Sequence, residues 1–527
     1  MRNFKRIIAF SLCLLILMLS CGCDIGSNGN KIISMDVDTK PKNIDPQLAV
    51  SDSELIISRN TLTGLFRINE DGKAEKSLCE SVEVSDDGLT YNFKIKDAKW
   101  SDDRQITADD FVFGITRALT PVTKSPYASS LFYIKNAEKF HNDEVDLAEL
   151  GISATDSMTV RITLEKKIAD IEYKLADLSA MPCNREFFTE CKGKYGLSEN
   201  DMLYCGPFYI SSWSEKSVTL NRNSNYAGGE VKPASVTMTF GGTSEERIYD
   251  ISKGVIDVAV IDAGKEELAK ESGLKTSSVR STVWAIIINP NAPIAGTELG
   301  SSALIKSLSR TEIERSLTTG YSIFSGIIAP DLFVCGEKYG SHIKEYTQQV
   351  ADVEQAKSEY MQALSEGSGS MSGASLLYVD YEKMSNIAIK IAASWQSNLD
   401  AYVNTESVSL DDMKTRIKNG DYTVALYPLG YGNYDAENVL KQFMTDNSDN
   451  IFGVSDPKFD SLMVSAINAV SAYDKANALH KAEQQLISGG YISPIVLSPT
   501  VIAKTPTMTG CIFDLNRGNF DFVNTGK

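Results

Sequence analysis

Histidine is scarce in this chain, and its scarcity limits the chemistry that the chain offers. The three histidines among 527 residues are His141, His342 and His480, which lie far apart in sequence and form no HExxH motif. No P-loop is present, and the stretch GSMSG at 369–373 has Met371 where a nucleophile elbow needs serine. We therefore predict no enzymatic activity, no cofactor and no resident metal ion.

Positive charge and long apolar runs are also in short supply. The 52 lysines and arginines are outnumbered by 69 aspartates and glutamates, which gives a formal net charge of −17. An acidic chain does not grip nucleic acid, because neutralising phosphates takes clustered basic side chains. After the N-terminal region, no apolar run approaches the roughly 18 residues that indicate a membrane-spanning helix. We expect neither nucleic-acid binding nor a membrane span in that part of the chain.

The spacing and number of the cysteines give a weaker indication of their chemical state. No CxxC spacing occurs, which argues against a zinc ribbon. The number of cysteines after the N-terminal region is even, which would permit disulfides in an exported protein. We expect buried free thiols for most of these residues, which are Cys79, Cys183, Cys191, Cys205, Cys335 and Cys511.

Residues 1–22 have the features of a lipoprotein signal peptide. Basic residues precede the apolar run Ile7–Leu19, which is too short to span a bilayer as a stable helix. The sequence Ser-Cys-Gly-Cys follows, and we predict that the thiol of Cys23 takes a diacylglyceryl group. Cys21 is the alternative, but bulkier residues precede it. An ordinary secretory signal with unmodified cysteines is the other interpretation. Residues 23–31 are rich in Gly, Ser and Asn and are expected to form a flexible tether.

Local signals in residues 82–128 predict a β-hairpin followed by a helix. Asp87-Gly88 indicates the turn, because glycine readily supplies a positive φ. Apolar residues alternate with polar ones from Val84 to Ile95 on either side of that turn, as in half-buried strands. Thr107 then offers a helix N-cap, and Pro121 ends the apolar helical stripe that follows.

The same residues resemble the signature of the family 5 extracellular solute-binding proteins, which serve ABC importers of peptides and nickel. The matching stretches are VSDDG at 84–88, KWSD at 99–102 and PVTKSPYA at 121–128. Asp103-Arg104-Gln105 replaces the usual Gly-x-Pro of the family, so we expect that turn to take another form. The resemblance continues along the mature chain, for example in KGVID at 253–257.

The resemblance implies an α/β fold of the two-lobe periplasmic-binding-protein type, with a hinge between the lobes. Lobe one would comprise residues 32–281, with an extra subdomain at about 66–180, and a C-terminal return at 499–527. Lobe two would comprise residues 282–498. Closure of the hinge around a ligand is the expected motion.

Periodicity predicts several elements of lobe two independently. Apolar residues at helical spacing predict helices over 353–364 and 384–399. Residues 376–379 and 422–427 read as strands. Because a strand, a helix and a strand follow in order, we expect a parallel sheet.

The resemblance also implies the ligand site, in which an extended peptide pairs with main chain of both lobes. One segment would be Ser51, Asp52, Ser53 and Glu54. The other would be Leu429, Gly430, Tyr431, Gly432 and Asn433, together with Asp435. In oligopeptide-binding relatives an aspartate of this second segment binds the free amino terminus of the peptide. Asn433 stands at that position here. Asp435 would serve instead, or it is a solvated loop carboxylate or a helix N-cap.

The implied function is that of an extracytoplasmic, lipid-anchored monomer. It would capture peptides in the cleft between the lobes and deliver them to an ABC permease, with the ATPase as an indirect partner. Two alternatives stay open. One is a peptide-sensing receptor without a transport role, and the other is a binder of a non-peptide solute such as a nickel complex, although the scattered histidines argue against nickel.

Overall fold

The structure is a computed structural model that describes residues 31–69, 72–347, 349–366, 371–430, 435–447, 449–514 and 519–527. One mixed sheet of eleven strands runs through the molecule, in the order β17-β16-β18-β12-β19-β11-β1-β10-β9-β8, with β13 paired to β19. Its strands are β1 (Ile32–Val37), β8 (Phe208–Trp213), β9 (Ser217–Arg222), β10 (Ser235–Phe240), β11 (Val258–Ile261), β12 (Lys275–Ile288), β13 (Ser322–Ile323), β16 (Ser375–Tyr378), β17 (Asn404–Ser407), β18 (Val424–Leu429) and β19 (Ile492–Lys504).

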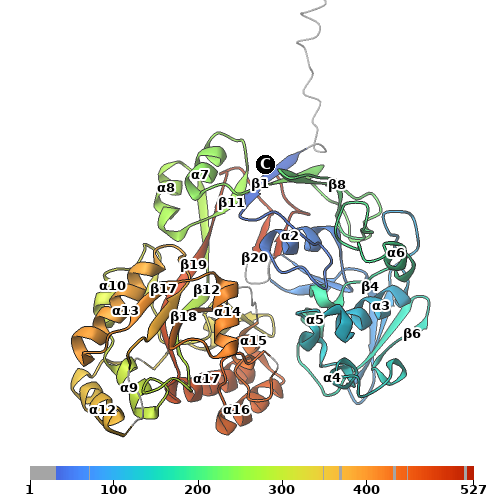
Figure 1. The fold of residues 1–527 in the computed structure, drawn as a ribbon. Helices are drawn as coiled ribbons and strands as arrows, with labels where there is room; N and C mark the ends of the chain where they lie inside the picture. The colour runs from blue at the N-terminus through green and yellow to red at the C-terminus, as the bar shows by residue number, and fades with distance from the viewer. Residues whose placement is uncertain are drawn as a thin grey trace, which may run out of the picture.

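Two long antiparallel strands, β12 and β19, connect two bodies that Figure 1 shows side by side. We call residues 32–281 and 499–527 lobe one and residues 282–498 lobe two, as predicted from the sequence. The β12–β19 ladder shifts register between Arg280 and Thr282, which pair with Pro499 and Ser498. The expected boundaries therefore face each other at a bulge, where strands bend most readily. Their exact positions stay a prediction.

Strand β12 is buried on both faces in lobe two. Its residues Trp284, Ile286 and Ile288 belong to one apolar cluster, and Val283, Ala285 and Ile287 belong to another. A strand covered by helices on both faces reads as a continuous apolar run rather than an alternating one. The sequence VWAIII has this pattern, and Trp284 donates its indole N–H to Ser498 Oγ within the core, at 3.0 Å.

The predicted hairpin and helix of residues 82–128 are confirmed. Strands β4 (Cys79–Val84) and β5 (Thr90–Ile95) pair across a turn in which Gly88 has a φ of 66°. Thr107 caps helix α3 (Ala108–Leu119) in a capping box with Asp110. Asp103, in the altered turn, itself adopts a positive φ of 69°.

These elements lie within the predicted subdomain of lobe one, at about residues 66–180. Its four-stranded sheet has the order β4-β5-β7-β6, with β6 (Ile152–Asp156) and β7 (Thr159–Thr163), and α3 packs against it. Two small hairpin strands, β2 (Phe66–Ile68) and β3 (Ala74–Lys76), pair beside it. The helices of lobe one are α2 (Asp52–Thr61), α4 (Ala137–His141), α5 (Ile171–Lys174), α6 (Arg185–Glu190), α7 (Ser244–Ser252) and α8 (Glu266–Glu271).

Helices cover the sheet of lobe two. The predicted helices are confirmed as α12 (Val353–Glu366) and α13 (Met384–Leu399), and β16 and β18 are parallel neighbours as expected. The strand expected at 422–427 lies two residues later, at Val424–Leu429, because a fully apolar run carries no alternation that marks its ends. The other helices and strands are α9 (Glu298–Lys306), α10 (Arg310–Glu314), β14 (Phe333–Val334), β15 (Glu337–Lys338), α11 (Tyr339–His342), α14 (Leu410–Asn419), α15 (Ala436–Lys441), α16 (Pro457–Ile467) and α17 (Ala472–Ser488).

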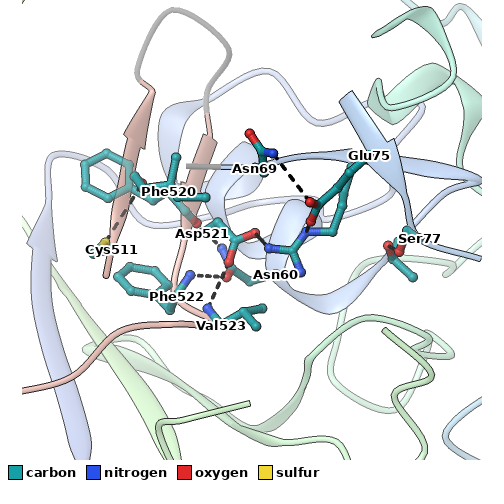
Figure 2. A network of polar contacts seen from close by, with 12 residues as sticks. Asn60, Asn69, Glu75, Ser77, Cys511, Phe520, Asp521, Phe522 and Val523 are labelled. Carbon is teal, nitrogen blue, oxygen red and sulfur yellow. Dashed lines mark hydrogen bonds and ion pairs between the residues drawn. The ribbon is translucent and has the colours of Figure 1, made fainter. Parts of the chain in front are cut away.

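The C-terminal segment returns to lobe one. Strands β20 (Ile512–Asp514) and β21 (Asn519–Asp521) form a hairpin beside α2 (Figure 2). The buried Asn60 side chain donates to the carbonyl of Phe520 and accepts from the N–H of Phe522 at 3.2 Å. Arg67 adds an ion pair to Asp521 at 2.9 Å. One buried amide thus ties the last strand to the first helix.

All six cysteines after the N-terminal region are free thiols, four of them buried. None of the described helices combines the length and the apolar character needed to cross a bilayer. Cys21 and Cys23 lie outside the described residues, as does the whole predicted signal peptide.

Candidate ligand site between the lobes

The first predicted ligand segment forms the beginning of helix α2. Ser51 is the N-cap, and its hydroxyl accepts from the N–H of Glu54 while the Glu54 side chain reaches back in a capping box. Ser53 is fully buried, and its hydroxyl lies 3.2 Å from that of Ser51. The side chains of Ser51 and Ser53 therefore hold the helix start in place.

Glu54 fixes the chain that leads into the helix. Its two carboxylate oxygens accept four backbone N–H groups from residues 42–51, at 2.8 to 3.1 Å. Burial alone would raise the pKa of this carboxyl, but the four N–H donors stabilise the charged form and lower its pKa. Glu54 is thus occupied by backbone donors and positions the segment rather than offering a charge to a ligand.

Asp52 differs from its three neighbours because its side chain is exposed and no ion pair to a described residue occupies it. The surrounding protein disfavours the charged form, and with the carboxylate of Asp38 nearby the pKa of Asp52 is raised. Of the four predicted residues, Asp52 is the one whose side chain is exposed and can contact a ligand.

The second predicted segment begins at Leu429, the last residue of β18 in lobe two. Leu429 is fully buried, so only its main chain could reach a ligand. Gly430 has a φ of 80°, and a Cβ there would lie 2.6 Å from the carbonyl oxygen of Ser281 in the β12 bulge. Glycine is therefore needed at 430 for its conformation and for this close approach. Tyr431, Gly432 and Asn433 lie outside the described residues.

Asp435 caps helix α15 and joins the two lobes. Its Oδ1 accepts from the N–H of Glu437 at 2.8 Å, and its Oδ2 pairs with the Nζ of Lys174 from α5 at 3.1 Å. Figure 1 shows α5 and α15 facing each other across the boundary between the bodies. The Lys174 side chain keeps 20% of its surface exposed and the Asp435 side chain keeps 30%. Solvent therefore reaches the pair at the boundary between the lobes.

A second ion pair lies beside the first. Lys475 of α17 contacts Glu437 at 2.6 Å, and both side chains are buried. Burial disfavours the charge of Lys174, yet the nearby carboxylates, Asp435 above all, hold its pKa well above the ordinary range. Burial likewise opposes the charge of Asp435, but Lys174 and Lys475 lower its pKa. Both members of the interlobe pair are therefore ionised near neutral pH.

The lobes also touch beside this pair. Lys166 of lobe one donates to the Asn468 side chain at 2.5 Å. The ring of Tyr173 lies so close to Gly336 that a Cβ there would come within 2.0 Å of it. Helix α5 and the chain around it thus lie against the β14–β15 hairpin of lobe two.

A separate contact forms at the end of β16. The Glu382 carboxylate accepts from the N–H groups of Ala263 and Gly264 in lobe one, at 3.0 and 3.3 Å. Glu382 and Lys383 both have positive φ, 43° and 68°, which is strained for residues with a side chain. Because β16 and β18 are parallel neighbours, their carboxyl ends lie at one edge of the sheet. That edge of lobe two therefore faces lobe one.

The described residues also include an acidic hollow that lies away from the predicted ligand segments. An open acidic hollow lies between β10 and α7, lined by Asp36, Glu245, Glu246 and Asp250 among others, and it shares no residue with either predicted segment. Asp36 is paired there with the buried Arg247 at 2.8 Å. Within the described ranges no group of three His, Cys, Asp or Glu side chains is arranged to hold a metal ion.

Sequence reasoning missed the lysines of this interface. Lys174 is 261 residues from Asp435 in sequence, and no local pattern joins them. The predicted alternative that Asp435 is a helix N-cap is confirmed, since Asp before an apolar helical run is a common start signal. Its partner could be found only once the two lobes were placed together.

Comparison with known proteins agrees with this architecture. The family profile of the bacterial extracellular solute-binding proteins, family 5, matches residues 73–450. The oligopeptide-binding protein OppA of Bacillus subtilis is 25% identical over 502 residues, covering 92% of this chain and 91% of that protein. A probable deoxycholate-binding periplasmic protein of Escherichia coli, YgiS, is 23% identical over 482 residues, with 89% and 88% covered.

Solved structures share the fold. Listeria monocytogenes OppA bound to peptide matches with a TM-score of 0.78 and 22% identity, covering 94% of this chain and 99% of that one. The two-lobe periplasmic-binding-protein fold is therefore confirmed. Since the family profile spans most of the chain, this protein belongs to the bacterial extracellular solute-binding proteins of family 5.

Proposed function

We propose that this protein is an extracytoplasmic solute-binding protein that captures peptides between its two lobes and delivers them to an ABC permease. The observation that carries the proposal is its family membership together with its similarity to an oligopeptide-binding protein over nearly the whole length of both chains. Two lobes joined by β12 and β19 give the hinge that such capture requires.

The ligand would lie between the start of α2 and the carboxyl edge of the lobe-two sheet. Asp52 offers an exposed carboxylate from lobe one, and Leu429 and Gly430 would offer main-chain groups from lobe two. Backbone pairing would bind peptides with little dependence on their side chains, as in strand addition to a sheet edge.

Anchoring belongs to the same proposal. The thiol of Cys23, or of Cys21, would carry the lipid, and residues 23–31 would tether the domain to the membrane surface. Two acyl chains are needed for stable anchoring, which a diacylglyceryl group supplies.

The test is ligand-induced stabilisation. A binding peptide selected from a random-sequence library, at about one hundred times its dissociation constant, should stabilise the protein by about 2.7 kcal/mol, seen as a raised melting temperature. A library that leaves the melting temperature unchanged would speak against peptide binding.

A non-peptide solute is the second candidate. The similarity to a probable deoxycholate-binding protein is the observation that favours it. Native mass spectrometry of the purified protein separates the two candidates, because a co-purified ligand is identified by its mass.

A further inference from the structure

The ion pair between Lys174 and Asp435 joins the two lobes beside the lobe-two segment that the sequence predicts to contact a ligand. Both oxygens of Asp435 already have partners, the Glu437 N–H on one side and the Lys174 ammonium on the other. Among the described residues, no other carboxylate lies within ion-pair distance of Lys174. The charge of Asp435 is therefore balanced by the protein itself.

The formation of this ion pair depends on how close the two lobes are to each other. Lys174 comes from lobe one and Asp435 from lobe two, so their contact exists only when the lobes lie close together. A ligand enclosed between the lobes would therefore meet Asp435 already neutralised. A ligand ammonium at this position would share one carboxylate with Lys174, and two like charges side by side at a partly buried site oppose each other.

We propose that Lys174 is a specificity-determining residue of the cleft. Its ammonium takes the place at Asp435 that a ligand ammonium would otherwise occupy. The closed protein accepts ligands that present a neutral or anionic group there, such as peptides with a blocked amino terminus, and discriminates against free amines. This inference rests on the proposed peptide-binding function and adds the chemistry of one end of the ligand.

The neighbouring lysines allow the charge at Asp435 to be tested by itself. Lys166 also reaches from lobe one to lobe two, but its partner is the neutral amide of Asn468. Lys166→Met is therefore a matched control that removes an interlobe lysine without touching Asp435. Lys174→Arg keeps a cation beside the carboxylate, whereas Lys174→Met removes it and keeps an unbranched apolar chain.

The experiment is titration calorimetry of the full-length protein with one random-sequence peptide library, prepared with free and with acetylated amino termini. We expect the wild type to bind the acetylated library more tightly, by about tenfold, the size expected for one partly buried charge contact. Lys174→Met should shift that ratio toward free amines by about tenfold. Lys174→Arg and Lys166→Met should keep the wild-type ratio.

Three results would overturn the inference. The first is a wild-type preference for free amines, which decides the matter even if Lys174→Met fails to fold. The second is a Lys174→Met variant that loses affinity for both libraries equally, because a purely structural link between the lobes would act that way. The third is an absence of binding to either library, which removes the peptide-binding proposal and this inference with it.

Discussion

Replacing Glu54 by glutamine is expected to loosen the start of α2, which forms the lobe-one side of the proposed ligand site. Four backbone N–H groups of residues 42–51 donate to the Glu54 carboxylate at 2.8 to 3.1 Å. Glutamine keeps one oxygen as an acceptor but turns an NH₂ donor toward the other two N–H groups. Two hydrogen bonds to a charged group, at about 1.5 kcal/mol each, give a loss of about 3 kcal/mol.

The pH dependence gives a second readout of the same interaction. Because folding lowers the pKa of Glu54, its contribution to stability is present above the ordinary glutamate pKa of about 4.3. It is lost as the pH falls through the lower pKa of the folded state. The difference in stability between wild type and Glu54→Gln should therefore be full at pH 7 and shrink below about pH 4.

The assay is thermal unfolding of both proteins at a series of pH values. A loss of about 3 kcal/mol should lower the melting temperature by several degrees at pH 7. Asp109→Asn is the matched control, because Asp109 is an exposed carboxylate in the first turn of another helix, α3, so its change should stay within about 0.5 kcal/mol. If Glu54→Gln melts with the wild type at pH 7, the four hydrogen bonds do not contribute as described.

Three further predictions concern other parts of the chain. Gly430→Ala should lower the stability measured by thermal unfolding by about 1–3 kcal/mol, which is more than Gly420→Ala should cost. Gly420 has a similar φ of 73° but open space around it. Equal losses of stability in the two variants would show that the approach to Ser281 is irrelevant. Asn60→Ala removes two buried hydrogen bonds to the C-terminal segment, to Phe520 in β21 and to Phe522 after it, at a cost of about 2 kcal/mol, and should speed proteolysis near the C-terminus. Unchanged cleavage would count against this anchor. Cys23→Ala, or else Cys21→Ala, should release the protein from the membrane, and a double variant that still incorporates labelled fatty acid would refute lipidation.

Local chemistry in the sequence was enough to predict many elements. Thr107 and Asp110 form the expected capping box of α3, and the helix expected at 384–399 is present as α13. These features depend on residues a few positions apart, where propensity and capping decide the structure. The end of β18 was placed less well, because an apolar strand buried on both faces lacks a period.

The contacts between distant segments could not be predicted in this way. Asp435 is recognisable as an N-cap, but its pairing with Lys174 depends on how two lobes dock. The role of Glu54 was also hidden, since a glutamate in the first turn of a helix usually faces solvent and here accepts four backbone donors. In both cases the partner is set by tertiary packing, which no local pattern encodes.

In the proposed function, peptides are captured between two lobes that close on them. Small-angle X-ray scattering of the protein, with and without the random-sequence peptide library, tests it most directly. We expect a smaller radius of gyration when peptides are bound, because lobes joined through β12 and β19 would open when no ligand lies between them. A radius of gyration that does not change when calorimetry shows the peptides to be bound would contradict capture by closure.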